Sequence, residues 1–162
     1  MCDTWVINAS PLILYGRIQR LDLVAALASV VIVPATVIEE VSRGMDKDST
    51  AAEAVEWAAQ YRQKDIAVPT SIERWDLGPG ESQVISFCLQ DKGLAILDDR
   101  MARRCIQAQG LRVTGSLGVI LMARKHGLIE AARPWVYKLI GEGMHIDTDL
   151  AENALASIGE GA

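Results

Sequence analysis

The segment Gly93-Leu-Ala-Ile-Leu-Asp-Asp-Arg100 carries most of the information about the fold. Its four apolar residues, 94–97, lie between a glycine and a pair of aspartates, which is typical of a short strand buried on both faces. Such strands lie inside parallel sheets that are covered by helices. The segment therefore predicts a central strand that ends at Asp98 and Asp99.

Similar signals continue outward along the chain in both directions. Apolar or β-branched runs predict further strands at residues 5–9, 30–33, 66–68 and 111–114. Helical spacing and turn residues predict helices at residues 11–16, 21–27, 34–44, 51–59, 81–91, 100–109, 117–126, about 130–140, and beyond 148. Strands that alternate with helices of this length form βα units with parallel strands. We therefore expect one α/β domain over residues 1–162.

The composition narrows the class of protein. Half of the 162 residues are hydrophobic, yet no apolar run approaches the roughly 20 residues that a membrane span needs. The first residues lack the basic and apolar regions of a secretory signal. Cys2, Cys88 and Cys105 are far apart and form no CxxC pair, which argues against disulfides and against a cysteine zinc site. We expect a soluble, cytoplasmic protein without a membrane partner.

Charge is unevenly distributed along the chain, whose net charge is -5. Residues 100–129 contain no acid, and their basic residues are Arg100, Arg103, Arg104, Arg112, Arg124 and Lys125. Solvated helix faces are the ordinary explanation for such residues. The absence of counter-charges within the stretch weakens that explanation, and an anionic partner becomes the alternative.

Polar residues gather where predicted strands end, which is where open parallel sheets bind ligands. Asn8 ends the first strand, and Asp98 with Asp99 ends the central one. Glu40 lies in the helix after the second strand, and Glu81 begins the helix before the central strand. Helix capping, the helix dipole and solvation explain each of them singly. The aspartate pair is the hardest to explain so, because adjacent like charges destabilise one another unless a cation or Arg offsets them.

Five short segments follow one another along the chain: Val6-Ile-Asn-Ala-Ser-Pro-Leu-Ile13, Val33-Pro-Ala-Thr-Val-Ile-Glu-Glu-Val41, Gly80-Glu-Ser-Gln-Val-Ile85, Ile96-Leu-Asp-Asp-Arg100 and Leu111-Arg-Val-Thr-Gly-Ser-Leu-Gly118. In order and spacing they resemble the PIN-like domains of small prokaryotic proteins, above all the branch related to VapC-type toxins. The resemblance covers residues 5 to about 155. It implies a doubly wound, mainly parallel sheet of about four to five strands with helices on both faces. It also implies a nuclease site of clustered carboxylates that binds Mg²⁺ or Mn²⁺.

The resemblance also assigns residues to this site. The family's metal-binding and catalytic acids fall on Glu40, Glu81 and Asp99, with Asp98 beside the last of these. The first acid of the family falls on Asn8, whose amide oxygen can ligate Mg²⁺ but adds no charge. One unit charge at 4 Å contributes about 4 kcal/mol at an effective dielectric constant near 20. We therefore expect the missing charge at Asn8 to lower the affinity for the metal. We expect the substrate to be bound by Ser10, Arg100, Arg103, Arg104, Thr114 and Ser116.

Three functions remain open. The first is a metal-dependent endoribonuclease, for which the resemblance suggests the role of toxin in a toxin–antitoxin pair with a small antitoxin. The second is a catalytically impaired PIN-like module that binds RNA or a protein partner, which Asn8 favours. The third is a phosphotransfer or phosphohydrolase domain with Asp98 or Asp99 as nucleophile. The resemblance also suggests a homodimer. We interpret His126 as a residue at a helix end and His145 as a surface residue.

Overall fold

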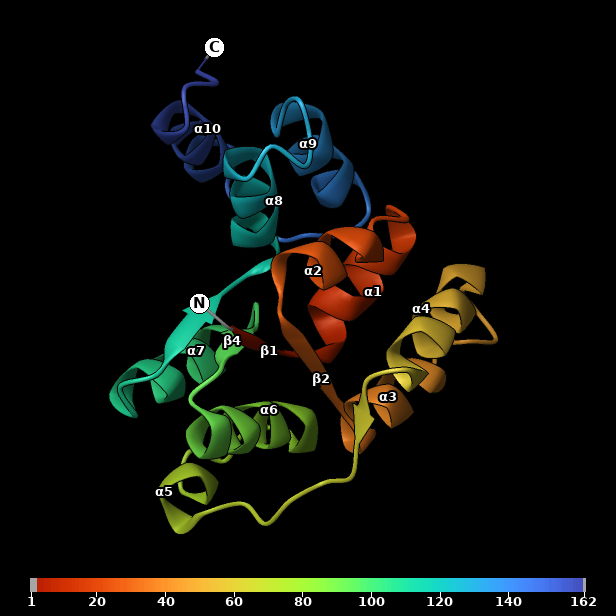
Figure 1. Ribbon diagram of the computed structural model, residues 1–162, viewed down its shortest axis with the longest axis vertical. Coiled ribbons are helices and arrows are strands. Elements are labelled where there is room, and N and C mark those ends of the chain that lie inside the picture. The colour runs from red at the N-terminus through yellow and green to blue at the C-terminus, as the bar shows by residue number, and fades with distance from the viewer. Residues whose placement is uncertain (1–2, 162) are drawn as a thin grey trace.

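The computed structural model describes residues 3–161 and contains one parallel sheet (Figure 1). Its five strands are β1 (Thr4–Ile7), β2 (Val30–Pro34), β3 (Arg62–Gln63), β4 (Leu94–Ile96) and β5 (Arg112–Thr114). They are ordered β3-β2-β1-β4-β5, and every pair of neighbours is parallel. The α/β class and the parallel sheet predicted from the sequence are confirmed.

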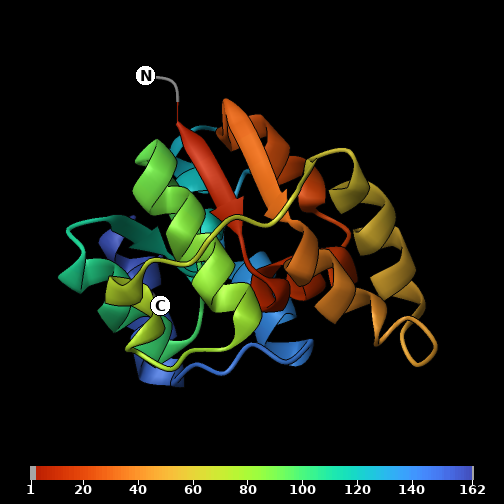
Figure 2. The ribbon, with the colours of Figure 1, turned by 90° about the horizontal axis from the view of Figure 1, so that it is seen from below.

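Helices cover both faces of this sheet (Figure 2). On one face α6 (Pro79–Asp91) crosses β1, β2 and β4, with α7 (Arg100–Ala108) beside it. The opposite face carries α1 (Ala9–Arg17), α2 (Leu21–Leu27) and α8 (Ser116–Lys125). The remaining helices pack on these: α3 (Ala35–Ser42), α4 (Ser49–Ala59), α5 (Thr70–Glu73), α9 (Arg133–Gly141) and α10 (Thr148–Ser157). The doubly wound arrangement is therefore present.

The core explains why the central strands have continuous apolar sequences. Trp5, Val6 and Ile7 of β1 are buried, and so are all three residues of β4. Because both faces of these strands are covered by helices, no position along them needs a polar side chain. Each fully buried large apolar side chain stabilises the fold by about 1.5–3 kcal/mol. This core fixes the positions of the strand ends.

One predicted strand is wrong. Residues 66–68 are not a strand, and β3 lies a few residues earlier, where Val33 of β2 pairs with Arg62. The extended segment at Ile66 instead bonds to the side chain of Gln83 on α6: the Ile66 amide donates to Oε1 at 2.9 Å and Nε2 donates to the Ile66 carbonyl at 2.7 Å. The helix side chain thus replaces a neighbouring strand, which the local pattern could not show.

No helix in residues 3–161 combines the length and the apolar character needed to cross a membrane.

Candidate functional site

The strand order reverses direction between β1 and β4, whose carboxyl ends lie side by side. The chain leaves β1 toward β2 and β3 on one side, and later returns to build β4 and β5 on the other. Ligands of doubly wound sheets bind where the order reverses in this way. The two strand ends are joined there by the Asn8 amide, which donates to the Ile96 carbonyl at 3.0 Å.

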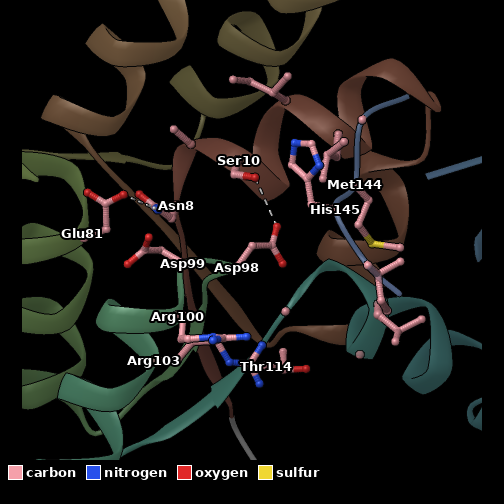
Figure 3. Close-up of a pocket in the computed structure, with 18 of the residues that line it drawn as sticks. Asn8, Ser10, Glu81, Asp98, Asp99, Arg100, Arg103, Thr114, Met144 and His145 are labelled. Carbon is pink, nitrogen blue, oxygen red and sulfur yellow. Dashed lines mark hydrogen bonds between the residues drawn. The ribbon is translucent and has the colours of Figure 1, made fainter. Parts of the chain in front are cut away.

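A pocket of about 1100 Å³ opens at this point (Figure 3). Most of the residues predicted to form the site line it: Asn8, Ser10, Glu81, Asp98, Asp99, Arg100, Arg103, Arg104 and Thr114. In Figure 3, Glu81, Asn8 and Asp99 gather at one end, while Met144 and His145 lie at the other. The structure thus brings acids, arginines and an apolar segment to one cavity.

Asn8 is the most unusual polar residue of the pocket. The residue is 3% exposed, and its Nδ2 donates to Oε1 of Glu81 at 3.4 Å. Its Oδ1 is buried and accepts no hydrogen bond. A buried acceptor without a partner costs about 1–3 kcal/mol, and such atoms are explained by function or by a bound ion or water. The unpartnered oxygen is therefore a candidate ligand.

Glu81 and Asp99 lie at the starts of two helices that converge on this end of the pocket. Glu81 lies in the first turn of α6, where the helix dipole favours its charge. Asp99 is the N-cap of α7, and its Oδ2 accepts from the Ala102 amide at 2.9 Å. Asp99 is exposed, so its charge faces the pocket. Both residues thus combine a helix-start role with an accessible carboxylate.

Glu40 lies behind this group and does not line the pocket. Its Oε1 accepts from the Gly80 amide at 3.0 Å, and a Cβ at residue 80 would come within 2.7 Å of its carboxylate oxygens. Glycine is therefore needed for Glu40 to approach α6. Burial, and then the charge of Glu81, raise the pKa of the Glu40 carboxyl. Two acids thus flank the start of α6, one inside the pocket and one set back.

The raised pKa of Glu40 makes stability depend on pH. Its ionised form is less favourable in the folded than in the unfolded state, so stability is full below the unfolded pKa and decreases as pH rises through the folded value. We expect Glu40→Gln to melt above the wild type at pH 7 in metal-free buffer, with the difference in melting temperature closing as pH falls toward 4. Thermal melts across this range would measure it. A gap that is constant with pH would contradict it.

Asp98 differs from its neighbour because its oxygens are already hydrogen-bonded. Oδ1 accepts from the Ser116 amide at 2.7 Å, and Oδ2 accepts from the hydroxyls of Ser116 at 2.7 Å and Ser10 at 3.2 Å. These bonds tie the end of β4 to the starts of α1 and α8. The predicted phosphate contact Ser116 is fully buried and bonds to this carboxylate. Both acids line the pocket, but Asp98 holds the loops through Ser10 and Ser116, whereas Asp99 accepts only from the backbone of its own helix.

Loss of the Asp98 contacts should destabilise the protein. Asp98→Ala leaves the buried Ser116 amide and hydroxyl without an acceptor, so we expect a loss of about 2–3 kcal/mol in the free energy of unfolding. Urea denaturation would measure this. Ser10→Ala is the matched control, since it removes only the longer, exposed bond and should cost under about 1 kcal/mol. Equal effects of the two variants would contradict a structural role of Asp98.

The basic stretch divides in the same way. Arg112 pairs with Asp3 at 2.9 Å and Arg124 with Glu160 at 3.5 Å, so acids distant in sequence supply the missing counter-charges. Arg100, Arg103 and Arg104 on α7 form no ion pair within residues 3–161. All three line the pocket. The unpaired positive charge beside the acids of the pocket therefore comes from α7 alone, and not from the whole basic stretch 100–129.

The sequence interpretation missed the far wall of the pocket. Segment 143–146, between α9 and α10, lines it together with Leu117 and Leu121 of α8. His145 is exposed, as expected, but it lies on this wall. His126 is the C-cap of α8, as expected, and lies outside the pocket. Only tertiary packing brings segment 143–146 to the pocket that Asn8 also lines, so no local pattern signals it.

Comparison with known proteins adds to this geometry. A family model for the PIN domain matches residues 4–160. The chain belongs to the PIN domain family. No curated protein sequence matches it significantly. Among solved structures, it is similar to the crystal structure of PAE2754 from Pyrobaculum aerophilum, with 13% identity over 65% of this chain and 87% of that one and a TM-score of 0.48.

PIN domains generally use a divalent metal ion, and the donor atoms of the pocket decide whether it fits one. In residues 3–161, no three acidic, histidine or cysteine side chains lie close enough to form a metal cage by themselves. The acidic end of the pocket nevertheless offers only oxygen donors: two carboxylates, Glu81 and Asp99, and the unpartnered Oδ1 of Asn8. Mg²⁺ prefers oxygen donors and keeps several waters. This PIN domain therefore fits a hard cation held by few protein ligands.

Proposed function

We propose that this PIN domain protein is a metal-dependent endoribonuclease. The observation that carries the proposal is the unpartnered, buried Oδ1 of Asn8 beside Glu81, in a pocket that also holds Asp99. A divalent ion at such donors supplies a nucleophilic water near neutral pH and offsets the charge that develops on a phosphate. The ion is expected to be Mg²⁺ or Mn²⁺, because all the donors are oxygens.

The side chains around this end have separate tasks in the proposal. Asn8, Glu81 and Asp99 hold the cation, and Glu40 positions the first turn of α6 by accepting from the Gly80 amide. The arginines of α7 bind the RNA backbone, since guanidinium groups donate paired hydrogen bonds to phosphate oxygens. These arginines are Arg100, Arg103 and Arg104. Asp98 holds the loops between which the scissile phosphate enters.

Purified protein incubated with single-stranded RNA tests the proposal directly. Cleavage is expected with Mg²⁺ or Mn²⁺, none with EDTA, and recovery when the metal is restored. The arginines add a salt dependence, because binding of phosphates by basic groups releases counterions. Cleavage that persists in EDTA would contradict a metal-dependent reaction, and no cleavage with either metal would contradict the nuclease.

A second candidate function is a PIN module that binds RNA without cutting it. It is favoured by the uncharged Asn8 and by Asp98, whose carboxylate is occupied by serine donors. Only two carboxylates then serve the cation, and its affinity falls with the missing charge. Salt-sensitive RNA binding without turnover would distinguish this function from the first.

The sequence resemblance supports a finer proposal, that the nuclease is a VapC-type toxin neutralised by a small antitoxin protein. Induced expression is then expected to arrest bacterial growth, and the Asp99→Asn variant is expected not to. Normal growth at high levels of active nuclease would exclude the toxin role and leave the nuclease proposal intact. Sedimentation of the purified protein would test the homodimer that the resemblance suggests.

A further inference from the structure

The end of the pocket opposite the acids is apolar. It is formed by side chains of α1, α8 and the segment from Met144 to α10: Ile13, Leu117, Leu121, Met144, Ile146 and Leu150. Leu150 is 57% exposed although it is a large apolar residue. Apolar side chains offer a phosphate or a cation neither hydrogen bonds nor opposite charge, so they do not help to bind either. The whole pocket, at about 1100 Å³, also exceeds the 300–1000 Å³ typical of small-molecule sites, so it has room for more than one nucleotide group.

His145 is the only ring among the described residues that line the pocket. The backbone on either side of it is anchored. Arg17 of α1 donates to the Glu142 carbonyl at 2.8 Å, and Gly143 follows with a φ of +116°, which favours glycine. Met144 is buried, and Asp147 accepts from the Asp149 amide at the start of α10. The ring is thus carried on a short segment that is fixed at both ends.

We propose that this apolar end and His145 accommodate one unpaired nucleobase of the RNA, next to the phosphate held by the arginines of α7. Bases of single-stranded RNA stack on histidine and other aromatic rings, with apolar side chains filling the remaining space. Gln107 lies on α7 at the same pocket and presents an exposed amide that can bond to a base edge. The inference rests on the proposed function and adds a base subsite to it.

The selectivity follows from the shape of the pocket. A base in a duplex is stacked and paired, so it cannot enter a cavity without being unpaired first. The arginines alone would bind duplex and single strand through their phosphates. The apolar end therefore adds affinity for an unpaired base, and this affinity does not depend on the metal.

Fluorescence anisotropy with a short labelled single-stranded RNA tests this directly. The measurements use the Asp99→Asn protein with Mg²⁺, which keeps the strand uncut. His145→Ala in this background is expected to weaken binding about 5- to 150-fold, as loss of one base stack does. His145→Phe is expected to restore binding, because it keeps the ring. His126→Ala is the matched control, since this exposed histidine lies outside the pocket, and it should leave binding unchanged.

RNAs with a single abasic ribose, placed at each position in turn, complete the experiment. At one position the abasic substitution should weaken binding, and there the difference between His145→Ala and its parent should disappear. Equal weakening by His145→Ala on the intact RNA and on every abasic RNA would overturn the inference. Equal affinity for the single-stranded RNA and for its duplex would overturn it too. Because these are binding measurements, an absence of cleavage would refute the nuclease but not the base site. Unchanged binding by His145→Ala would refute the base site but not the nuclease.

Discussion

Asp99→Asn is expected to lower the rate of RNA cleavage at least about 100-fold, which corresponds to ~2.7 kcal/mol of transition-state stabilisation. The substitution removes the charge of one of the three carboxylates that line the pocket, Glu81, Asp98 and Asp99. It should leave the fold intact, because asparagine is as good an N-cap as aspartate and can accept the Ala102 amide. Single-turnover cleavage kinetics and thermal melts measure the two effects separately.

Two further variants control this result. Asp99→Ala should show the same loss of cleavage and, in addition, lose about 1 kcal/mol of stability with the cap. Asp91→Asn removes an exposed charge at the far end of α6, at the opposite edge of the sheet, and should cut RNA at the normal rate. A fully active Asp99→Asn enzyme would remove Asp99 from the catalytic group.

Asn8→Asp is expected to tighten Mn²⁺ binding by at least about tenfold, and it should raise the cleavage rate of the protein. The substitution adds a charge at the position whose oxygen already lacks a partner. One unit charge at 4 Å contributes about 4 kcal/mol at an effective dielectric constant near 20, before the cost of desolvation is subtracted. The increase in melting temperature on addition of Mn²⁺ reports the affinity, because a ligand that binds only the folded state stabilises it.

The same variant should be less stable than the wild type without metal. Its new carboxylate would be buried beside Glu81, and like charges at such a distance destabilise one another. The predicted signature is therefore a lower melting temperature in EDTA and a larger upward shift with Mn²⁺. If the wild type does not cut RNA and Asn8→Asp does, the natural protein is the binding module. An unchanged response to Mn²⁺ would place the cation elsewhere.

The sequence predicts the fold well because its strongest signals are local. The apolar run at residues 94–97 and the β-branched run at 30–33 became central strands since helices cover them on both sides. Where a tertiary contact replaced a ladder, as between Gln83 and the backbone of Ile66, the predicted strand was wrong. The short helix α5 was not predicted, because four residues give too little periodicity.

The candidate site could be predicted only in part. Parallel strands end at one edge, so the sequence placed Asn8 and Asp99 together. It could not distinguish Asp98 from Asp99, since their roles depend on Ser116, a residue of another helix. It could not show that acids outside residues 100–129 neutralise Arg112 and Arg124. The apolar wall at Met144 was missed for the same reason, because its packing onto α8 is long-range.

The strand order also governs when the site can exist during synthesis. β1 is made first, yet one of its two partners is β4, with Trp5 opposite Leu94. Domains that depend on such distant pairings fold late, and loop closure over a long chain must precede the contacts that reward it. The acidic end of the pocket therefore cannot form until Asp99 has left the ribosome, and the wall that carries His145 can form only later still. Under the proposed function, a nascent chain that still lacks Asp99 cannot cut the messenger RNA from which it is being made.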